Sequence, residues 1–165
     1  MKITTKDITY NAIICALYIA LTLLASPIAF LGIQFRIAEV LVLLCFFNPS
    51  YTIGLVLGTA IANFNSPMAP TDIGLGALAT LLACLGIIFM KHLLFAVMFP
   101  IVTNSLIVGF ELYWLAKEPL LISIVQIALS ELIIMIIGYI LFYFLHKRKD
   151  FKTIVNAKRN ENFKF

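Results

Sequence analysis

Apolar residues dominate this chain in six long runs, which short polar or proline-containing stretches separate. The runs cover residues 8–26, 36–47, 51–63, 73–90, 93–115 and 120–145. The breaks between them carry proline, asparagine or charge, as in "NPS" at 48–50 and "KEP" at 117–119. Runs of this kind are typical of helices in a bilayer, which about 20 apolar residues can span. The pattern predicts an all-α integral membrane protein of six transmembrane helices, formed as one domain by residues 1–146.

Composition supports the bilayer as solvent. Of the 165 residues, 62% are apolar, whereas a soluble domain is closer to half apolar. The three cysteines, Cys15, Cys45 and Cys84, lie singly inside apolar runs. Their spacing fits no metal site, so we expect buried, inert thiols.

Basic residues predict the orientation. Six crossings place both ends of the chain on one side, and ten of the twelve Lys and Arg residues then fall on that side. Only Arg36 and Lys117 fall on the other, so the positive-inside rule predicts cytoplasmic termini in the cell membrane. Seven of the ten lie in residues 147–165. We expect this segment to be a basic cytoplasmic tail at the membrane surface, with little influence on ligand binding.

The second and third runs are short for a membrane span. Their 12 and 13 residues would rise only about 18–20 Å as α-helix, against a hydrocarbon core of ~30 Å. Short helices are tolerated where they line a cavity or are buried in protein. The alternative is that these boundaries are drawn too tightly.

Polar residues inside the runs gather in the predicted outer half of the membrane. An ionised side chain near a helix centre costs about 2.5–3.5 kcal/mol, so such groups face a partner or a wet cavity. We therefore predict one cavity that opens to the outside. Its candidate substrate-binding residues are Arg36, Glu39, Asn63, Asp72, Asn104, Glu111, Trp114, Gln126 and Glu131.

Several of these residues also have a simpler interpretation. Arg36 and Glu39, three residues apart, fit an ion pair at the interface. Asp72 fits the N-cap of the fourth helix, and Trp114 fits an interfacial aromatic anchor. Glu131 is the hardest to explain in this way, because it lies deep and has no basic neighbour on its own helix.

The expected cavity carries more carboxylates than cations, which suits a ligand that is cationic or rich in hydrogen-bond donors. One carboxylate can accept two donors side by side from a guanine-like edge. Tyr113 and Trp114 would stack on a flat ring.

The sequence holds no phosphate-binding glycine loop of the G-x-x-x-x-G-K-[ST] type, no H-E-x-x-H and no G-x-S-x-G. We therefore expect no enzyme, no metal and no cofactor in this chain. Ala12, Ala16 and Ala20 form a stripe of small residues on the first helix. Such a stripe lets another helix approach closely, either inside the bundle or in a partner protein.

Five stretches of this sequence resemble the queuosine-precursor transporter family (QueT). They are "QFRIAEVLVLL", "GLVLGTAIANFNSP", "DIGLGALATLLA", "TNSLIVGFEL" and "LSELII", and the likeness runs from about residue 8 to residue 145. Ala38 departs from the serine expected in the first stretch, which leaves the finer substrate choice open.

This resemblance implies the S-component, or substrate-binding subunit, of an energy-coupling factor (ECF) transporter. The family implies six helices and an outward-facing site for a 7-deazaguanine base: the aminomethyl precursor preQ1, the nitrile precursor preQ0 or queuine. It also implies a partner module of one membrane T-component and two ATPases, which use the ATP. Docking on the T-component would use the alanine stripe.

Two other function classes stay open at this stage. A small proton-coupled secondary transporter would work without a partner, with Glu131 as the proton-coupling carboxylate. A non-transporting interaction protein would use the alanine stripe alone. Neither class involves nucleic acid.

Overall fold

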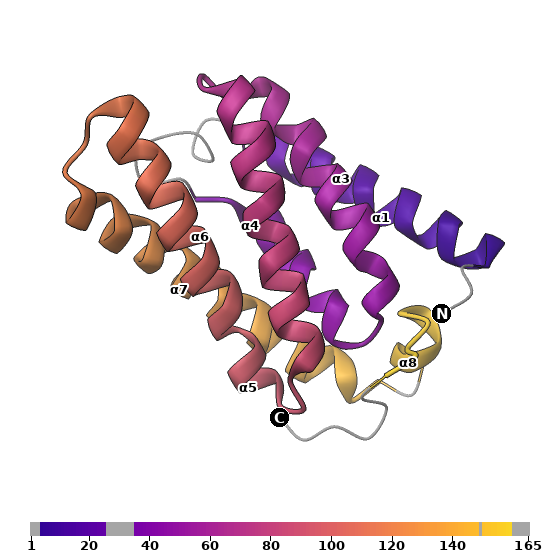
Figure 1. Ribbon diagram of the computed structural model, residues 1–165. Helices are drawn as coiled ribbons and strands as arrows, with labels where there is room; N and C mark the ends of the chain where they lie inside the picture. The colour runs from indigo at the N-terminus through magenta and orange to yellow at the C-terminus, as the bar shows by residue number, and fades with distance from the viewer. Residues whose placement is uncertain (1–3, 26–34, 149, 160–165) are drawn as a thin grey trace.

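The computed structural model describes residues 4–25, 35–148 and 150–159, and every regular element in these ranges is helical (Figure 1). The α-helices are α1 (Thr5–Leu24), α3 (Thr52–Ala62), α4 (Ala69–Phe89), α5 (Leu93–Ala96), α6 (Met98–Glu111), α7 (Leu120–His146) and α8 (Phe151–Ile154). Three 3₁₀ helices and one π-helix complete them: η1 (Ile37–Phe46), η2 (Pro49–Tyr51), η3 (Asn63–Asn65) and the π-helix η4 (Leu112–Ala116).

All six apolar runs fold as helix, which confirms the predicted all-helical class. Within the described ranges, four stretches are long and apolar enough to cross a membrane: Thr5–Leu24, Ala69–Phe89, Leu93–Ala116 and Leu120–His146. The second and third runs form η1 and α3, of 10 and 11 residues. Their shortness is thereby confirmed, while six crossings and the sidedness of the termini stay predictions.

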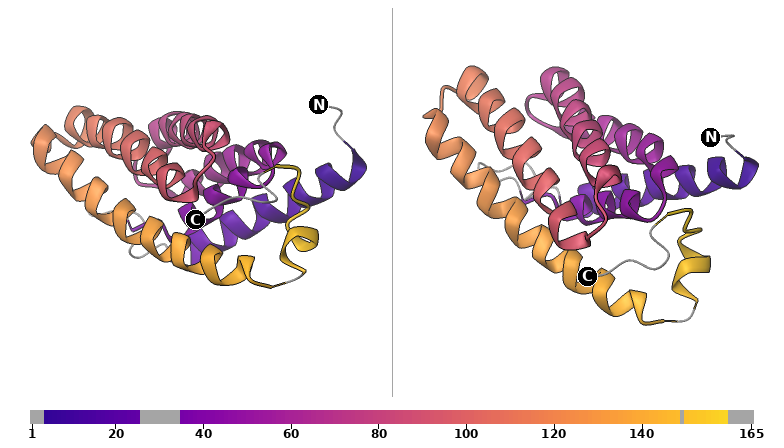
Figure 2. Two further views of the ribbon diagram at one scale, coloured as in Figure 1. Left: turned by 90° about the horizontal axis from the view of Figure 1, so that it is seen from below. Right: turned by 60° about the horizontal axis from the view of Figure 1, so that its bottom comes forward.

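The helices form two layers around η1. Figure 2 shows α3, α4 and α6 side by side in one layer, with α1 and α7 in the other. The central η1 packs against α1, α4 and α7. A 3₁₀ helix rises about 2.0 Å per residue, so ten residues reach about 20 Å, where an α-helix would reach about 15 Å. This stretched geometry lets a short run traverse much of the bundle.

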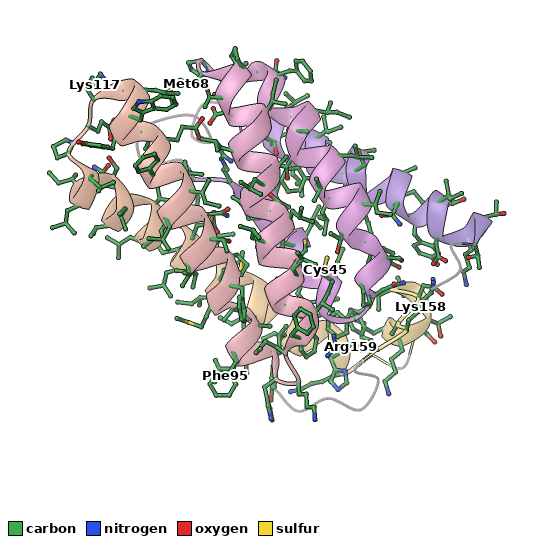
Figure 3. The ribbon with its side chains drawn as sticks, in the orientation of Figure 1. Cys45, Met68, Phe95, Lys117, Lys158 and Arg159 are labelled. Carbon is green, nitrogen blue, oxygen red and sulfur yellow. The ribbon has the colours of Figure 1, made fainter. Side chains whose placement is uncertain are left out.

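The outer surface of the bundle is apolar. Leu24, Phe89 and Leu121 are each more than 70% exposed, and Figure 3 shows many carbon-only side chains projecting outward from the helices. A soluble protein rarely exposes apolar residues so continuously. A lipid-facing surface accounts for this pattern.

The described part of the tail packs against one end of the bundle. Phe151 is only 4% exposed, and its ring lies 5.1 Å from that of Phe47, centroid to centroid. The backbone N–H groups of Lys158 and Arg159 both donate to the Phe47 carbonyl, at 3.0 Å each. These two bonds attach the tail to the residue that directly follows η1.

Two further elements hold the same segment. The Tyr51 hydroxyl donates to the Val155 carbonyl at 2.7 Å, and the Lys158 ammonium forms an ion pair with Asp7 near the start of α1. Residues 150–159 therefore contribute to the packing of the bundle, while the expected small influence of this segment on ligand binding stays a prediction.

Candidate functional site

A buried polar cluster lies among the helices, and five separate elements contribute to it. The cluster consists of Arg36 before η1, Glu39 in η1, Asn63 at the end of α3, Asp72 in α4, Asn104 and Glu111 in α6, and Glu131 in α7. Each of these seven residues is at most 5% exposed. All seven were predicted from the sequence as binding residues.

Two glutamates of the cluster are each hydrogen-bonded through one oxygen only. Tyr18 of α1 donates its hydroxyl to Glu39 Oε1 at 2.5 Å, and Asn104 donates its amide to Glu131 Oε1 at 2.8 Å. The second oxygen of each carboxyl group is buried and has no hydrogen-bond partner among the described residues. Glu39 and Glu131 also lie close enough to interact electrostatically. Two buried acceptor oxygens could therefore each accept a hydrogen bond from a donor-rich ligand.

Among the described residues, Arg36 forms an ion pair with Asp72 and none with Glu39. Its Nη2 lies 3.9 Å from Asp72 Oδ1, which is an ion pair too long for a hydrogen bond. The predicted Arg36–Glu39 pair is wrong. Arg36 precedes η1 with a non-helical backbone (φ −90°, ψ 81°), while Glu39 is bonded by Tyr18. The Nε and Nη2 atoms of Arg36 have no hydrogen-bond partner in the described parts of the chain.

Asp72 is not an N-cap, so that simpler interpretation is also wrong. The N-cap of α4 is Met68, and Asp72 lies three residues after the first helical residue, Ala69. Its carboxyl group accepts a hydrogen bond from the Ser66 hydroxyl, and its backbone carbonyl accepts one from the Asn63 amide at 2.7 Å. These two bonds fix the loop before α4 to the first turns of the helix.

Glu111 is the least satisfied residue of the cluster. It is fully buried at the last position of α6, next to the π-helix η4. Both of its carboxyl oxygens are without a hydrogen-bond partner in the described residues. Asp72 and Arg36 are its electrostatic neighbours. A buried carboxyl group in this condition is costly to the fold, so it points to a role in binding.

The cluster has an excess of acid. Within the described part of the chain it brings four carboxyl groups together with one guanidinium. No set of three or more His, Cys, Asp or Glu residues there could hold a metal ion. Burying several carboxylates without enough counter-charge is strongly unfavourable. The arrangement therefore suits a ligand that brings donors or positive charge.

The other two predicted residues lie outside the cluster. Trp114 is 58% exposed, and Gln126 is partly buried on α7. Tyr113 is also exposed. Neither aromatic ring is buried beside the carboxyl groups, so the structure lends no support to stacking on a flat ligand. Their exposure in η4, directly after α6, favours the interfacial-anchor interpretation.

Three contributors escaped the sequence analysis: Tyr18, Ser66 and Gly76. A Cβ atom at Gly76 would collide with the Asn63 amide, whereas its distance of 3.6 Å from Arg36 Nη1 would be an ordinary contact. This glycine therefore makes room for the Asn63 side chain. Tyr18 gave a usable signal, because a buried tyrosine hydroxyl in an apolar helix needs a hydrogen-bond partner.

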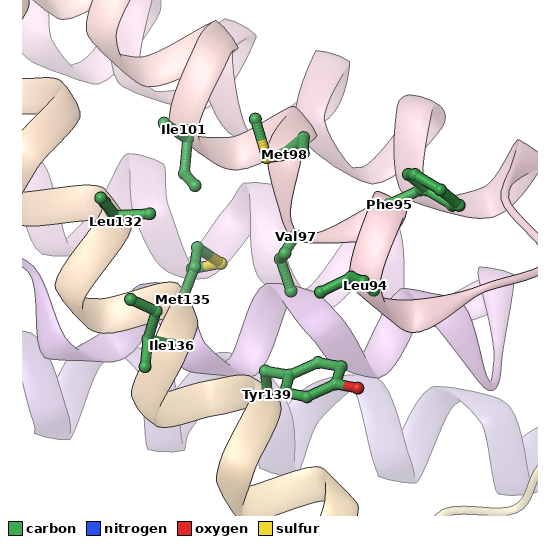
Figure 4. Close-up of a pocket in the computed structure, with 9 residues that line it drawn as sticks. All are labelled: Leu94, Phe95, Val97, Met98, Ile101, Leu132, Met135, Ile136 and Tyr139. Atoms are coloured by element: carbon green, nitrogen blue, oxygen red, sulfur yellow. The ribbon is translucent and has the colours of Figure 1, made fainter. Parts of the chain in front are cut away.

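Two apolar grooves lie on the outside of the bundle. The larger, of about 510 Å³, runs between the α5–α6 region and α7; Leu94, Met98 and Leu132 help to line it (Figure 4). The other, of about 420 Å³, lies between α1 and α3 and includes Ala12 in its wall. Ala12, Ala16 and Ala20 are all exposed on α1. The stripe is thus accessible to another helix, and docking through it stays a prediction.

Comparison with known proteins supports the resemblance noted in the sequence. A sequence model of the family described as "QueT transporter" matches residues 8–147. The protein named queuosine precursor transporter QueT of Lactococcus lactis subsp. cremoris (strain MG1363) is 32% identical over 167 residues, which cover 90% of this chain and 97% of that protein. No solved structure matches this chain. The chain therefore belongs to the QueT transporter family, a family of membrane transporters and not of enzymes.

Proposed function

We propose that this chain is the substrate-binding S-component of an ECF-type importer and that its polar cluster binds a queuosine precursor, a 7-deazaguanine base. Family membership supports a transporter, and the name of the Lactococcus relative supports this substrate class. The cluster would face the outside of the cell, with both termini in the cytoplasm.

The observation that carries the proposal is that Glu39 and Glu131 each have one buried oxygen without a hydrogen-bond donor among the described residues. Tyr18 and Asn104 orient the two carboxyl groups and leave one acceptor oxygen on each without a partner among the described residues. The pyrimidine edge of a 7-deazaguanine base offers a ring N–H next to an amino group. Carboxylates accept such donors through strong, charge-assisted bonds.

The energy for import would come from a partner module. The chain has no phosphate-binding motif of its own, and the exposed stripe of Ala12, Ala16 and Ala20 offers a close-packing surface for a membrane partner. The partner would be the membrane T-component together with its two ATPases.

The test compares two glutamate-to-glutamine variants in binding titrations of the purified, detergent-solubilised chain. Glu131→Gln should weaken binding of a 7-deazaguanine base at least tenfold, because one charge-assisted acceptor is lost. Glu118→Gln is the matched control, since Glu118 lies in the loop before α7, outside the cluster, and its carboxyl group accepts a hydrogen bond from the Ser123 hydroxyl. An unchanged affinity in Glu131→Gln would remove Glu131 from the site.

The acid excess of the cluster also favours a second candidate, a self-sufficient proton-coupled transporter. In that case proteoliposomes containing this chain alone would accumulate a 7-deazaguanine base when a proton gradient is imposed. The S-component proposal predicts binding without accumulation in the same vesicles, and accumulation only after the ATPase module and ATP are supplied.

A further inference from the structure

The carboxyl groups of the cluster fall into two pairs, and Arg36 lies between them. Glu131 interacts with Glu39, and Glu111 interacts with Asp72. Arg36 interacts with both Glu39 and Glu131 and forms the ion pair with Asp72. The first pair is the Glu39–Glu131 pair, and the second is the Asp72–Glu111 pair.

The two pairs lie apart along α6. Asn104, which bonds Glu131, and Glu111 are seven residues apart on this helix. Seven residues make about two turns, so both side chains face the same side of α6, about 10 Å apart along its axis. A ligand that reaches both pairs is therefore elongated and carries polar groups at two ends.

The two pairs differ in how far the protein satisfies them. In the Glu39–Glu131 pair, each carboxyl group already receives one hydrogen bond from a protein donor. In the Asp72–Glu111 pair, Ser66 bonds one oxygen of Asp72, while Asp72 Oδ1 and both oxygens of Glu111 have no donor among the described residues. Three buried acceptor oxygens are thus concentrated at one end of the cluster.

Arg36 does not neutralise the negative charge of the Asp72–Glu111 pair. Its guanidinium is 3.9 Å from Asp72, and it is shared with the Glu39–Glu131 pair. A neutral donor would satisfy one or two oxygens and leave the negative charge uncompensated. A primary ammonium group supplies three N–H donors and a positive charge in a compact volume.

We infer that the Asp72–Glu111 pair is a second subsite, which holds a primary ammonium group of the ligand while the Glu39–Glu131 pair holds its flat, donor-rich edge. This inference rests on the proposed function and assigns its specificity. Glu111 is the specificity-determining residue, and the preferred substrate is a base that carries an aminoalkyl group.

The test uses two 7-deazaguanine bases that differ only at one end, the aminomethyl base and the nitrile base. The wild-type chain should bind the aminomethyl base at least about tenfold more tightly, as expected for hydrogen bonds between charged groups. Glu111→Gln should abolish this preference, because it should lower the affinity for the aminomethyl base and leave the affinity for the nitrile base unchanged. Glu131→Gln should lower the affinity for both bases to a similar extent, and Glu118→Gln should change neither affinity.

Asp72→Asn is the second variant, because it keeps an acceptor for the Ser66 hydroxyl and removes the charge; it too should reduce the preference. Thermal unfolding of each variant in detergent controls for the fold. Equal affinities of the wild-type chain for the two bases would overturn the inference alone. An equal loss of affinity for both bases in Glu111→Gln would also overturn it. If the wild-type chain binds neither base, the proposed function is overturned as well.

Discussion

At the residue scale, the polar cluster combines hydrogen bonds that orient side chains with buried oxygens that lack donors. Tyr18 orients Glu39 through a 2.5 Å bond, and Asn104 orients Glu131. An unsatisfied buried polar group costs about 1–3 kcal/mol. A fold that keeps several of them at one place gives up stability there, and ligand binding is the function that accounts for this cost.

Tyr18→Phe tests the orienting role of the tyrosine. The variant leaves Glu39 Oε1 without its donor, so we expect a loss of about 1–3 kcal/mol in unfolding free energy and weaker binding of the base. Tyr113→Phe is the control, because Tyr113 is 47% exposed. The measurements are denaturant unfolding in mild detergent and ligand titration. Equal behaviour of the two variants would show that the Tyr18 hydroxyl does not support the site.

At the element scale, a single glycine of α4 makes room for Asn63, which lies at the end of α3. Gly76→Ala should displace the Asn63 amide, because the new Cβ would collide with it. The bond from Asn63 to the Asp72 carbonyl would be strained or lost, and both stability and ligand affinity should fall.

Gly74→Ala is a matched control on the same helix. Nothing lies within 4 Å of a Cβ at Gly74, and alanine is favoured over glycine in a helix by about 1 kcal/mol. This variant should be neutral or slightly stabilised in thermal unfolding. A Gly76→Ala variant that is as stable as Gly74→Ala, with unchanged affinity, would contradict the packing around Asn63.

The exposed stripe of α1 allows a separate prediction about partner docking. Ala16→Leu should leave base binding intact and reduce ATP-dependent uptake at least tenfold, because the larger side chain keeps a partner helix at a distance. Gly74→Leu places the same side chain on an exposed position of α4 and should leave uptake unchanged. Normal uptake by Ala16→Leu would exclude the stripe as the docking surface.

Some features of these elements were predictable from the sequence and others were not. The helical runs follow from the apolar pattern, which is local, and an acid inside such a run, such as Glu131, is expected to find a buried partner. The partner of Arg36 depends on where α4 places Asp72, and the role of Tyr18 depends on η1 lying against α1. These are tertiary relations, and spacing along the chain does not encode them.

At the scale of the whole molecule, a segment late in the chain packs against helices from its first third. Residues 150–159 connect α1, η1 and η2 through the Lys158–Asp7 ion pair, the Phe47 carbonyl and the Tyr51 hydroxyl. Because η1 also carries Glu39, the tail supports the element on which part of the site is built.

Truncation after Lys149 should therefore lower the unfolding free energy by several kcal/mol, about 1 kcal/mol for each lost hydrogen bond together with the burial of Phe151. Truncation after Arg159 is the control, since it keeps every tail contact described above. Thermal unfolding in detergent compares the two proteins. Similar unfolding temperatures would show that the tail contacts add no stability.

The most direct test of the central claim is equilibrium binding by the purified, detergent-solubilised chain alone, without ATP or partner subunits. The ligands are preQ1, preQ0 and queuine, with guanine and riboflavin as controls. A membrane-embedded binding subunit predicts saturable binding of at least one 7-deazaguanine base, much tighter than guanine, and no binding of riboflavin. Absence of binding to all three bases by a folded chain would contradict the account.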